Sequence, residues 1–313
     1  MKQPVSYSQK IFKNNLYNCY VIPADDGTPL AVKQIGNKTK YPLLLGNGVG
    51  VPWFGFHHLC NQLKDDFDIY LWDYRGSSES FPVGKPDFSI KNQAKDALKI
   101  MTSFGFVNFA YLGWSMGVPV GIEINRQAPG KISVLAALFG SPGHPYRESL
   151  GKTGNWSLLQ AVKYGLNHLG TASLLKFVLK SKPALIQKLF VKMGFISKDV
   201  DPELFAEVFL AVVKNNTTYY GQSLLALGKY NGWPYLEQLD FPVLVAGGGK
   251  DWVSPARTMK KMAESIKNSD YNFIEEGCHF SLMQLDEDIY SPVKYFLSSK
   301  INQINPPETE NIR

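Results

Sequence analysis

A serine set between two glycines is the first place in this chain where residue type and spacing could do chemistry. Residues 113–117 read Gly-Trp-Ser-Met-Gly, a G-x-S-x-G pattern. The pattern follows an apolar run over residues 107–112 and precedes a plausible helix over residues 116–127. A strand that turns sharply into a helix in this way leaves its serine exposed, and the glycines prevent collisions with neighbouring backbone. The pattern therefore predicts that Ser115 is a nucleophile.

A serine hydroxyl is a poor nucleophile until a base takes its proton and a third group orients that base. His279 is the predicted base, because it follows the last apolar strand candidate in a loop that we expect at the same sheet edge as Ser115. His144, after the strand candidate 132–139, is the second candidate. The other histidines, for which helical core or surface positions are expected, are His57, His58 and His168.

Asp251 is the predicted acid of the same site. It follows the apolar strand candidate 241–247, and the chain order Ser…Asp…His fits this assignment. Its proposed role is to hold the tautomer of His279 and to stabilise the imidazolium ion. A helix N-cap is the other role open to this aspartate. The strand after Ser115 ends in Ser141-Pro142 without a carboxylate, which favours Asp251.

Acyl transfer also needs backbone N–H groups that stabilise a developing oxyanion. One is expected from Met116, directly after the nucleophile, and the other from the glycine-rich loop 46–52. Val49 is assigned as the second donor, with Gly48 as the alternative. The spacing of these glycines matches neither a P-loop nor a dinucleotide-binding fingerprint.

Aromatic residues near these motifs are candidate walls of a substrate pocket. Trp53, Phe54 and Trp114 are assigned to it beside Gly48, although each aromatic side chain could equally be plain core. No metal-ligand spacing is present, and no cofactor is expected.

Short apolar segments alternate with helical stretches through most of the chain, which predicts a mostly parallel α/β sheet with helices on both faces. Eight strands are expected, at residues 17–22, 30–35, 42–45, 68–72, 107–114, 132–139, 242–246 and 271–274. Residues 142–236 instead read as helix after helix, so an all-α cap is expected between core segments 1–141 and 237–301. The polar tail 302–313 is expected to fray.

The predicted cap carries an unusual charge. Between residues 144 and 236 there are ten lysines and one arginine against five acids, an excess that equals the formal net charge of +6 of the whole chain. Apolar residues of 174–179 are expected opposite Lys176 and Lys180, and those of 185–193 opposite Lys188 and Lys192. This pattern fits a solvated lysine face over a packed apolar face, or a surface that meets anionic lipid or an anionic substrate. No nucleic-acid-binding motif accompanies it.

The three cysteines, Cys19, Cys60 and Cys278, are far apart and indicate a reducing compartment rather than a disulfide framework. The N-terminus lacks an apolar run of signal-peptide length, and no apolar stretch is long enough to span a bilayer. A cytoplasmic protein is therefore expected.

Taken together, residues 16–300 resemble an α/β-hydrolase-fold protein with a helical cap. The matching features are the glycine-rich loop, Asp73-Tyr74-Arg75-Gly76 with Ser80, the serine pattern, and the Asp251 and His279 loops. Two segments depart from the family pattern. Asn47-Gly48 stands where many members have His-Gly, and residues 73–80 lack the usual second glycine. A serine nucleophile argues against the family's epoxide hydrolases and dehalogenases, which use aspartate.

The resemblance implies a range of activities, because this family carries many reactions on one scaffold. The first hypothesis is a serine hydrolase that cleaves a carboxylic ester with an apolar acyl or alkyl group through an acyl-enzyme. The alternatives are an acyltransferase, a thioesterase or a carbon–carbon bond hydrolase with the same triad. A ligand-binding or sensor protein with little turnover is the alternative from another class.

Overall fold

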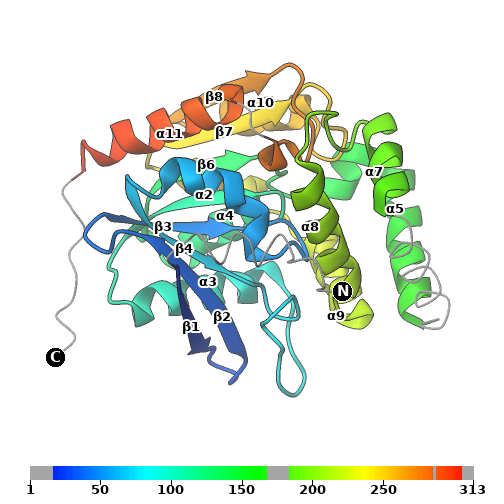
Figure 1. Cartoon of the computed structure of the whole chain (residues 1–313), viewed down its shortest axis with the longest axis horizontal. Helices are drawn as coiled ribbons and strands as arrows, with labels where there is room; N and C mark the ends of the chain where they lie inside the picture. The colour runs from blue at the N-terminus through cyan, green and yellow to red at the C-terminus, as the bar shows by residue number, and fades with distance from the viewer. Residues whose placement is uncertain (1–16, 168–182, 285–286, 305–313) are drawn as a thin grey trace, which may run out of the picture.

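The computed structural model describes residues 17–167, 183–284 and 287–304. The strands within these ranges form one eight-stranded sheet. The strands follow the order β1-β2-β4-β3-β5-β6-β7-β8 across the sheet (Figure 1). Their bounds are β1 (Tyr17–Pro23), β2 (Pro29–Gly36), β3 (Tyr41–Gly46), β4 (Phe67–Trp72), β5 (Phe109–Trp114), β6 (Ile132–Leu138), β7 (Val243–Gly248) and β8 (Ser269–Ile274). The predicted eight-stranded sheet is thus confirmed.

The sheet is parallel except at one edge, where β2 pairs antiparallel with both β1 and β4. Every residue of β3, β4, β5 and β7 is buried, as expected for parallel strands covered on both faces. Successive side chains of β3 alternate between two cores, since Leu43 and Leu45 belong to one hydrophobic cluster and Leu44 to the other.

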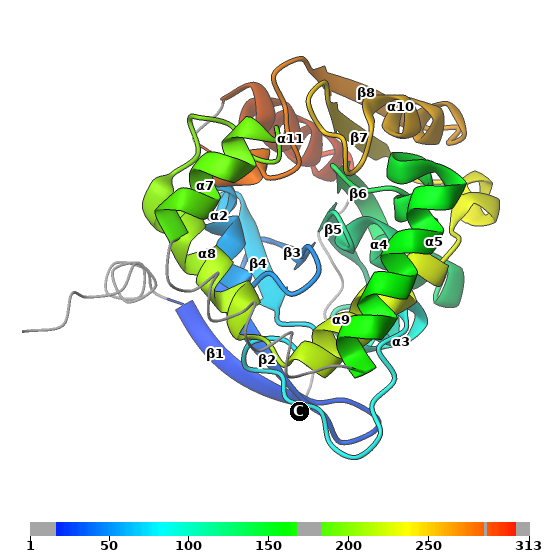
Figure 2. The same ribbon diagram turned by 90° about the vertical axis from the view of Figure 1, so that its right-hand side faces the viewer.

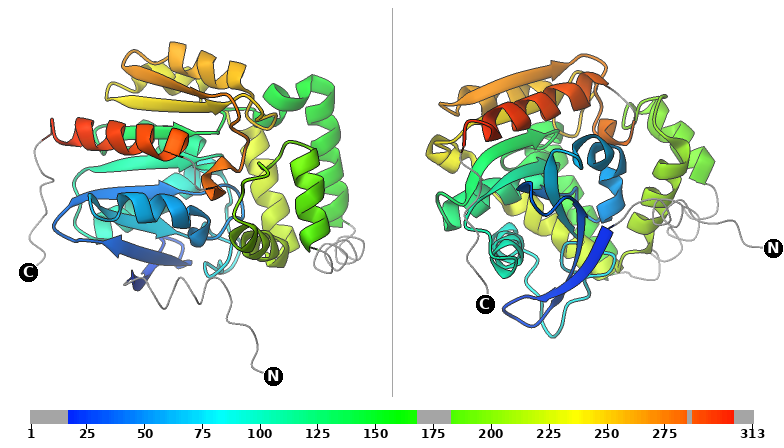
Figure 3. Two further views of the ribbon diagram at one scale, coloured as in Figure 1. Left: turned by 45° about the horizontal axis from the view of Figure 1, so that its top comes forward. Right: turned by 60° about the vertical axis from the view of Figure 1, so that its left-hand side comes forward.

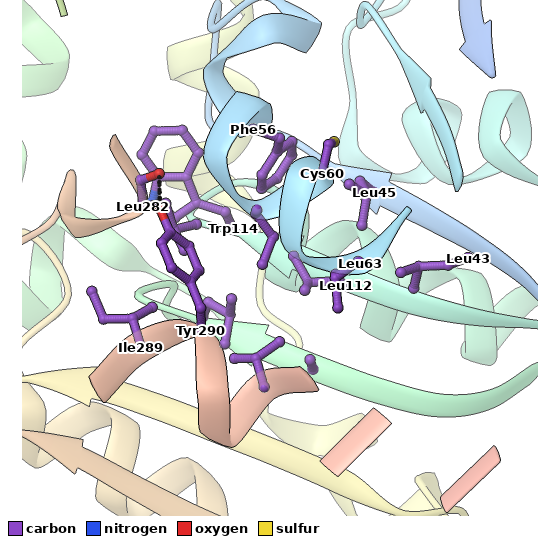
Figure 4. Close-up of a cluster of buried hydrophobic side chains, with 14 of the residues drawn as sticks. Leu43, Leu45, Phe56, Cys60, Leu63, Leu112, Trp114, Leu282, Ile289 and Tyr290 are labelled. Carbon is purple, nitrogen blue, oxygen red and sulfur yellow. Dashed lines mark hydrogen bonds between the residues drawn. The ribbon is translucent and has the colours of Figure 1, made fainter. Parts of the chain in front are cut away.

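Helices pack on both faces of the sheet. The first cluster contains buried residues of α2 (His57–Leu63) and α11 (Glu287–Ile301), and its contacts with β3 and β5 are drawn in Figure 4. The second contains residues of α3 (Ile90–Ser103), α4 (Gly117–Gln127) and α10 (Ala256–Glu264). The predicted α/β layering is confirmed. Because helices cover both faces of the sheet, a site is expected at the carboxyl ends of the strands.

The helices between β6 and β7 gather at the carboxyl end of the sheet, where all views place them (Figures 1 and 3). They are α5 (Pro145–Asn167), α7 (Pro183–Lys192), α8 (Pro202–Lys214) and α9 (Thr217–Lys229), followed by the short 3-10 helix η2 (Trp233–Gln238). Viewed from this end, they surround the ends of β3 and β5 (Figure 2). Within the described ranges, no helix is long and apolar enough to cross a membrane.

One expectation about these cap helices is wrong. Residues 185–193 do not present a single packed apolar face opposite their lysines, because Leu185, Leu189 and Met193 are exposed. The reason is that α7 packs on α8 through a narrow side around Phe190, whose ring lies 5.9 Å from those of Phe205 and Phe209. The predicted face at residues 174–180 and His168 lie outside the described residues.

Candidate active site

Ser115 lies on a tight turn between β5 and α4. Its φ of 54° falls in the left-handed region, which a serine rarely adopts. A side chain at Gly117 would overlap the carbonyl oxygen of Gly46, so the second glycine of the pattern is required by close packing of α4 against β3. The strand–turn–helix expected from the sequence is therefore the arrangement that the structure has.

Ser115, His279 and Asp251 form one chain of hydrogen bonds. Oγ of Ser115 lies 3.0 Å from Nε2 of His279, and Nδ1 of His279 lies 3.0 Å from Oδ2 of Asp251. With Nδ1 protonated, the imidazole donates to the carboxylate and leaves Nε2 to accept the serine proton. Both His279 and Asp251 are buried. The three side chains have the geometry of a nucleophile, a base and a group that orients the base.

The Asp251 carboxylate is held by the backbone that follows it. Its Oδ1 accepts hydrogen bonds from the N–H groups of Val253 and Ser254, each at 2.8 Å. This leaves Oδ2 for His279. The alternative reading of Asp251 as a cap for α10 is not what the structure shows, because Pro255 is the N-cap of that helix and makes no side-chain cap.

Trp114 has a second role that the sequence did not reveal. Its indole N–H donates to the carbonyl oxygen of His279 at 2.9 Å, and its ring packs against Phe280 and Phe56. The Trp114 side chain is fully buried beside Phe56 (Figure 4). The residue before Ser115 therefore fixes the loop that carries the predicted base.

The other histidines lie elsewhere. Nε2 of His58 lies 3.3 Å from Oδ2 of Asp201, where the start of α8 meets the core. His57 is next to it on α2, where burial lowers its pKa to about 4 and the neighbouring His58 adds to the shift. His144, the second candidate base, precedes α5 and does not line the cavity that contains Ser115.

The predicted oxyanion donors stand beside Ser115. Gly48, Val49 and Met116 all line the cavity together with Ser115. Among the described residues, the N–H groups of Val49 and Met116 donate to no acceptor in the protein. Two unused backbone donors next to a serine Oγ are suited to an oxyanion.

The loop that carries Val49 is braced by a residue of the cap. Asn215, at the end of α8, donates through Nδ2 to the carbonyl oxygen of Gly50 at 2.8 Å, and its Oδ1 accepts from Ser78 N–H at 3.1 Å. Asn47, which departs from the family pattern in this loop, does not brace it: within the described structure both polar atoms of that buried amide lack a partner. Sequence patterns offered no signal for Asn215, because it is 165 residues away from Gly50.

Gly50 explains why the brace can come so close. Its φ of 71° favours glycine. A Cβ there would lie 2.6 Å from the ring of Tyr220 and 2.9 Å from Nδ2 of Asn215. Residues 46–52, which carry the predicted donor Val49, are called the oxyanion loop. Two cap residues therefore contact this loop at Gly50, where no side chain fits.

A cavity of about 260 Å³ opens over Ser115 between the sheet edge and the cap. Trp114 and Gly48 line it, as expected. The cap contributes mainly apolar side chains, among them Tyr146, Leu150, Leu158, Val212, Tyr220, Leu224 and Leu227. In the part of the chain that the structure describes, no group of three or more His, Cys, Asp or Glu side chains could hold a metal ion.

Trp53 and Phe54 do not line this cavity, contrary to expectation. They line a separate hollow with Asp73 and Asn215. The N–H of Trp53 donates to Oδ1 of Asp73 at 3.1 Å, and its ring packs 5.5 Å from that of Tyr17. These contacts hold the start of the 3-10 helix η1 (Trp53–Phe56) against Asp73 and Tyr17.

The fold is similar to that of many solved enzymes. An esterase from Exiguobacterium antarcticum superposes with a TM-score of 0.73 at 22% identity, over 90% of this chain and 98% of the esterase. A bromoperoxidase from Bacillus anthracis gives a TM-score of 0.74 at 16% identity, over 90% of this chain and 99% of that chain. At this level of identity the likeness shows the fold and not the reaction.

Similarity to curated sequences is more local. The karrikin insensitive 2 receptor IA of Petunia hybrida is 28% identical over 120 residues, which are 36% of this chain and 42% of the receptor. The chain spans less than half the length of the curated relatives it matches. A family model described as alpha/beta hydrolase fold matches residues 44–285, from the middle of β3 to beyond His279. The chain therefore belongs to the alpha/beta hydrolase fold family.

Proposed function

We propose that the protein is a serine hydrolase that cleaves carboxylic esters bearing an apolar acyl or alkyl group. The observation that carries this proposal is the hydrogen-bonded chain from Ser115 through His279 to Asp251, which opens into an apolar cavity. Solved structures with the same fold include two esterases, which is consistent with the proposal.

In the proposed reaction, His279 takes the hydroxyl proton as Ser115 Oγ attacks the ester carbonyl. The N–H groups of Val49 and Met116 stabilise the tetrahedral oxyanion. The His279 imidazolium, stabilised by Asp251, then gives its proton to the leaving alcohol and an acyl-enzyme forms. Water activated by His279 hydrolyses this intermediate and regenerates Ser115.

The cavity favours an apolar group on one side of the ester. Its cap wall presents Leu158, Val212, Leu224 and Leu227 and no charged side chain among the lining residues. Burial of apolar surface stabilises a ligand by about 25 cal/mol per Å². The same wall excludes bulk water from the reacting atoms, which strengthens the oxyanion interactions. Product analysis with competing alcohols distinguishes hydrolysis from acyl transfer on the same residues.

A second candidate is a ligand-binding protein with the same cavity and little turnover. The 120-residue similarity to a protein named as a receptor favours it. Thermal stabilisation by a small ester or lactone, without product in the same sample, would select this candidate over the hydrolase.

A fluorophosphonate probe tests the nucleophile directly. Wild type is expected to be labelled, Ser115→Ala to be unlabelled, and Ser149→Ala to be labelled like wild type. Ser149 is a fitting control because it lines the same cavity but donates to the carbonyl oxygen of Pro145. Labelling that persists in Ser115→Ala would overturn the assignment. A chain-length series of nitrophenyl esters then tests the substrate class, and no turnover of any ester would reject it.

A further inference from the structure

The cap exposes an unusual set of large apolar side chains. On α5, Trp156 is 64% and Tyr164 is 59% exposed. On α7, Leu185 and Leu189 are 58% and 47% exposed, and Met193, directly after this helix, is 44% exposed. Single exposed apolar residues are normal, whereas a group of them at one end of the molecule, where Figure 1 places both α5 and α7, marks an interaction site. These five residues, together with Lys188 and Lys192, are called the cap face below.

The arrangement on α7 is regular. Leu185 and Leu189 lie on one side of the helix, and Met193, whose N–H donates to the carbonyl oxygen of Leu189 at 2.9 Å, continues this side directly after the helix ends. Lys188 and Lys192, also exposed, lie on the same side three residues after Leu185 and Leu189. This side thus combines apolar and cationic groups, while the opposite side around Phe190 packs on α8.

The charge of the cap face has one sign. The sequence from residue 149 to residue 198 contains eight lysines and no aspartate or glutamate. The next acids are Asp199, on an exposed turn, and Asp201, which caps α8 and lies 3.3 Å from His58. The exposed lysines of α7 are therefore available to a partner with negative charge.

The cap face continues to the rim of the cavity over Ser115. Leu150 on α5 and Trp252 beside Asp251 both line that cavity and are more than two-fifths exposed. The indole N–H of Trp252 donates to the carbonyl oxygen of Met193 at 3.1 Å, which joins the end of α7 to the rim. In Figure 2, α5 and α7 lie on two sides of the ring of cap helices.

We propose that the cap face docks on an anionic lipid bilayer. Leucine and methionine side chains would enter the interface, Trp156 and Tyr164 would lie at the headgroup level, and the lysines would reach anionic headgroups with their aliphatic stems along the surface. Docking in this orientation brings the rim at Leu150 and Trp252 to the lipid surface. The binding goes beyond the proposed hydrolysis and does not require turnover.

Flotation of the full-length protein with vesicles tests the docking. Wild type and Ser115→Ala are both expected to float with vesicles of phosphatidylcholine and phosphatidylglycerol and not with phosphatidylcholine alone. Use of Ser115→Ala, alongside turnover of a water-soluble ester by wild type, separates failure of docking from failure of the proposed function. Lys188→Gln with Lys192→Gln should lower the partition coefficient about tenfold or more, since each lysine near an anionic surface contributes about fivefold.

Matched variants distinguish a specific face from general charge. Lys91→Gln with Lys95→Gln removes the same charge at the same spacing from exposed positions on α3, and should change binding by about twofold at most because those charges lie far from the bilayer. Leu189→Gln with Met193→Gln should abolish flotation, whereas Tyr295→Gln, 77% exposed on α11, should not. Apart from Ser115→Ala, these variants alter exposed side chains, and unchanged thermal midpoints establish that all of them fold.

Several outcomes would overturn the proposal. One is flotation of wild type with neutral vesicles equal to that with anionic vesicles, and another is no flotation of wild type with either. A third is a loss of binding in Lys91→Gln with Lys95→Gln as large as in Lys188→Gln with Lys192→Gln. A dimer that Leu189→Gln with Met193→Gln dissociates, without vesicle binding by wild type, would instead assign the cap face to a second copy of the chain.

Discussion

The carboxyl edge of the sheet and the helical cap above it differ in how firmly their side chains are held. At the sheet edge, each side chain of the Ser115–His279–Asp251 chain has a named partner, and the surrounding strands are fully buried. In the cap, α5 and α7 expose apolar side chains beside lysines. Pre-organised groups suit the chemical step, whereas an exposed, adaptable surface suits recognition.

The two regions are not independent. Asn215 joins the end of α8 to the oxyanion loop, and Trp252 joins the loop after Asp251 to the end of α7. The cap is therefore joined to the loops around Ser115 and Asp251 by two hydrogen bonds as well as by the cavity wall.

The largest effect is expected from the sheet edge. In Asp251→Asn, the amide would present an N–H to Nδ1 of His279 and favour the tautomer that cannot accept the serine proton. The kcat for ester hydrolysis should fall by about 10³–10⁴-fold. The thermal midpoint, measured in parallel, should change little. Asp199→Asn, on an exposed turn, is the control and should keep wild-type kcat; a kcat close to wild type in Asp251→Asn would remove this residue from the site.

Asn215→Ala is expected to have the next largest effect, because it breaks the contact between the regions. The Gly50 carbonyl and the Ser78 N–H lose their partner, so Val49 N–H is less firmly placed for the oxyanion. The kcat should fall about tenfold with little change in KM, since misplaced donors weaken transition-state binding above all.

A matched control for this variant is the adjacent residue. Asn216 caps α9 by accepting from the N–H groups of Thr218 and Tyr219, and within the described residues it makes no hydrogen bond to the oxyanion loop. Asn216→Ala should lower the thermal midpoint, because loss of a cap costs about 1 kcal/mol, and should leave kcat near wild type. Equal kcat losses in both variants would mean that Asn215 acts only through cap stability.

A smaller and more selective effect is expected from the cavity wall. Leu224 lines the cavity over Ser115, whereas the next residue, Leu225, lines a different hollow beside α3. Leu224→Phe should reduce kcat/KM for long-chain esters about tenfold and leave acetate esters unaffected, since pocket shape discriminates by about 1–3 kcal/mol. A chain-length series measures this, and Leu225→Phe should follow wild type throughout. A uniform loss across all chain lengths would show that Leu224 does not set the length limit.

The two regions also differ in how well the sequence predicted them. Periodic apolar segments located all eight strands, and the glycine pattern, strand-end positions and chain order brought out Ser115, Asp251 and His279. Those signals are local, because a buried strand or a strained turn restricts its own residues. Asn215, the hydrogen bond of Trp114 to the His279 loop, and the position of Trp53 depend on contacts between distant segments. The exposed side of α7 was missed for the same reason, since only its packing on α8 decides which apolar residues are buried.

The smallest effect concerns stability of the core under the cap. Burial lowers the pKa of His57 to about 4 from 6.5, and His58 adds to this shift. The unfolded chain therefore takes up a proton at His57 at a higher pH than the folded protein, so this contribution is complete above about pH 6.5 and is lost as the pH falls toward 4. In wild type, the free energy of unfolding from urea titrations should drop by about 1–3 kcal/mol over that window through this group.

His57→Gln keeps a polar partner for Asn61, which lies 3.1 Å from Nε2, and should flatten the profile of unfolding free energy between those pH values. If this variant keeps the wild-type slope of stability against pH, the acid sensitivity belongs to other groups. His58 is one such group, and its contact with Asp201 links the core to the cap.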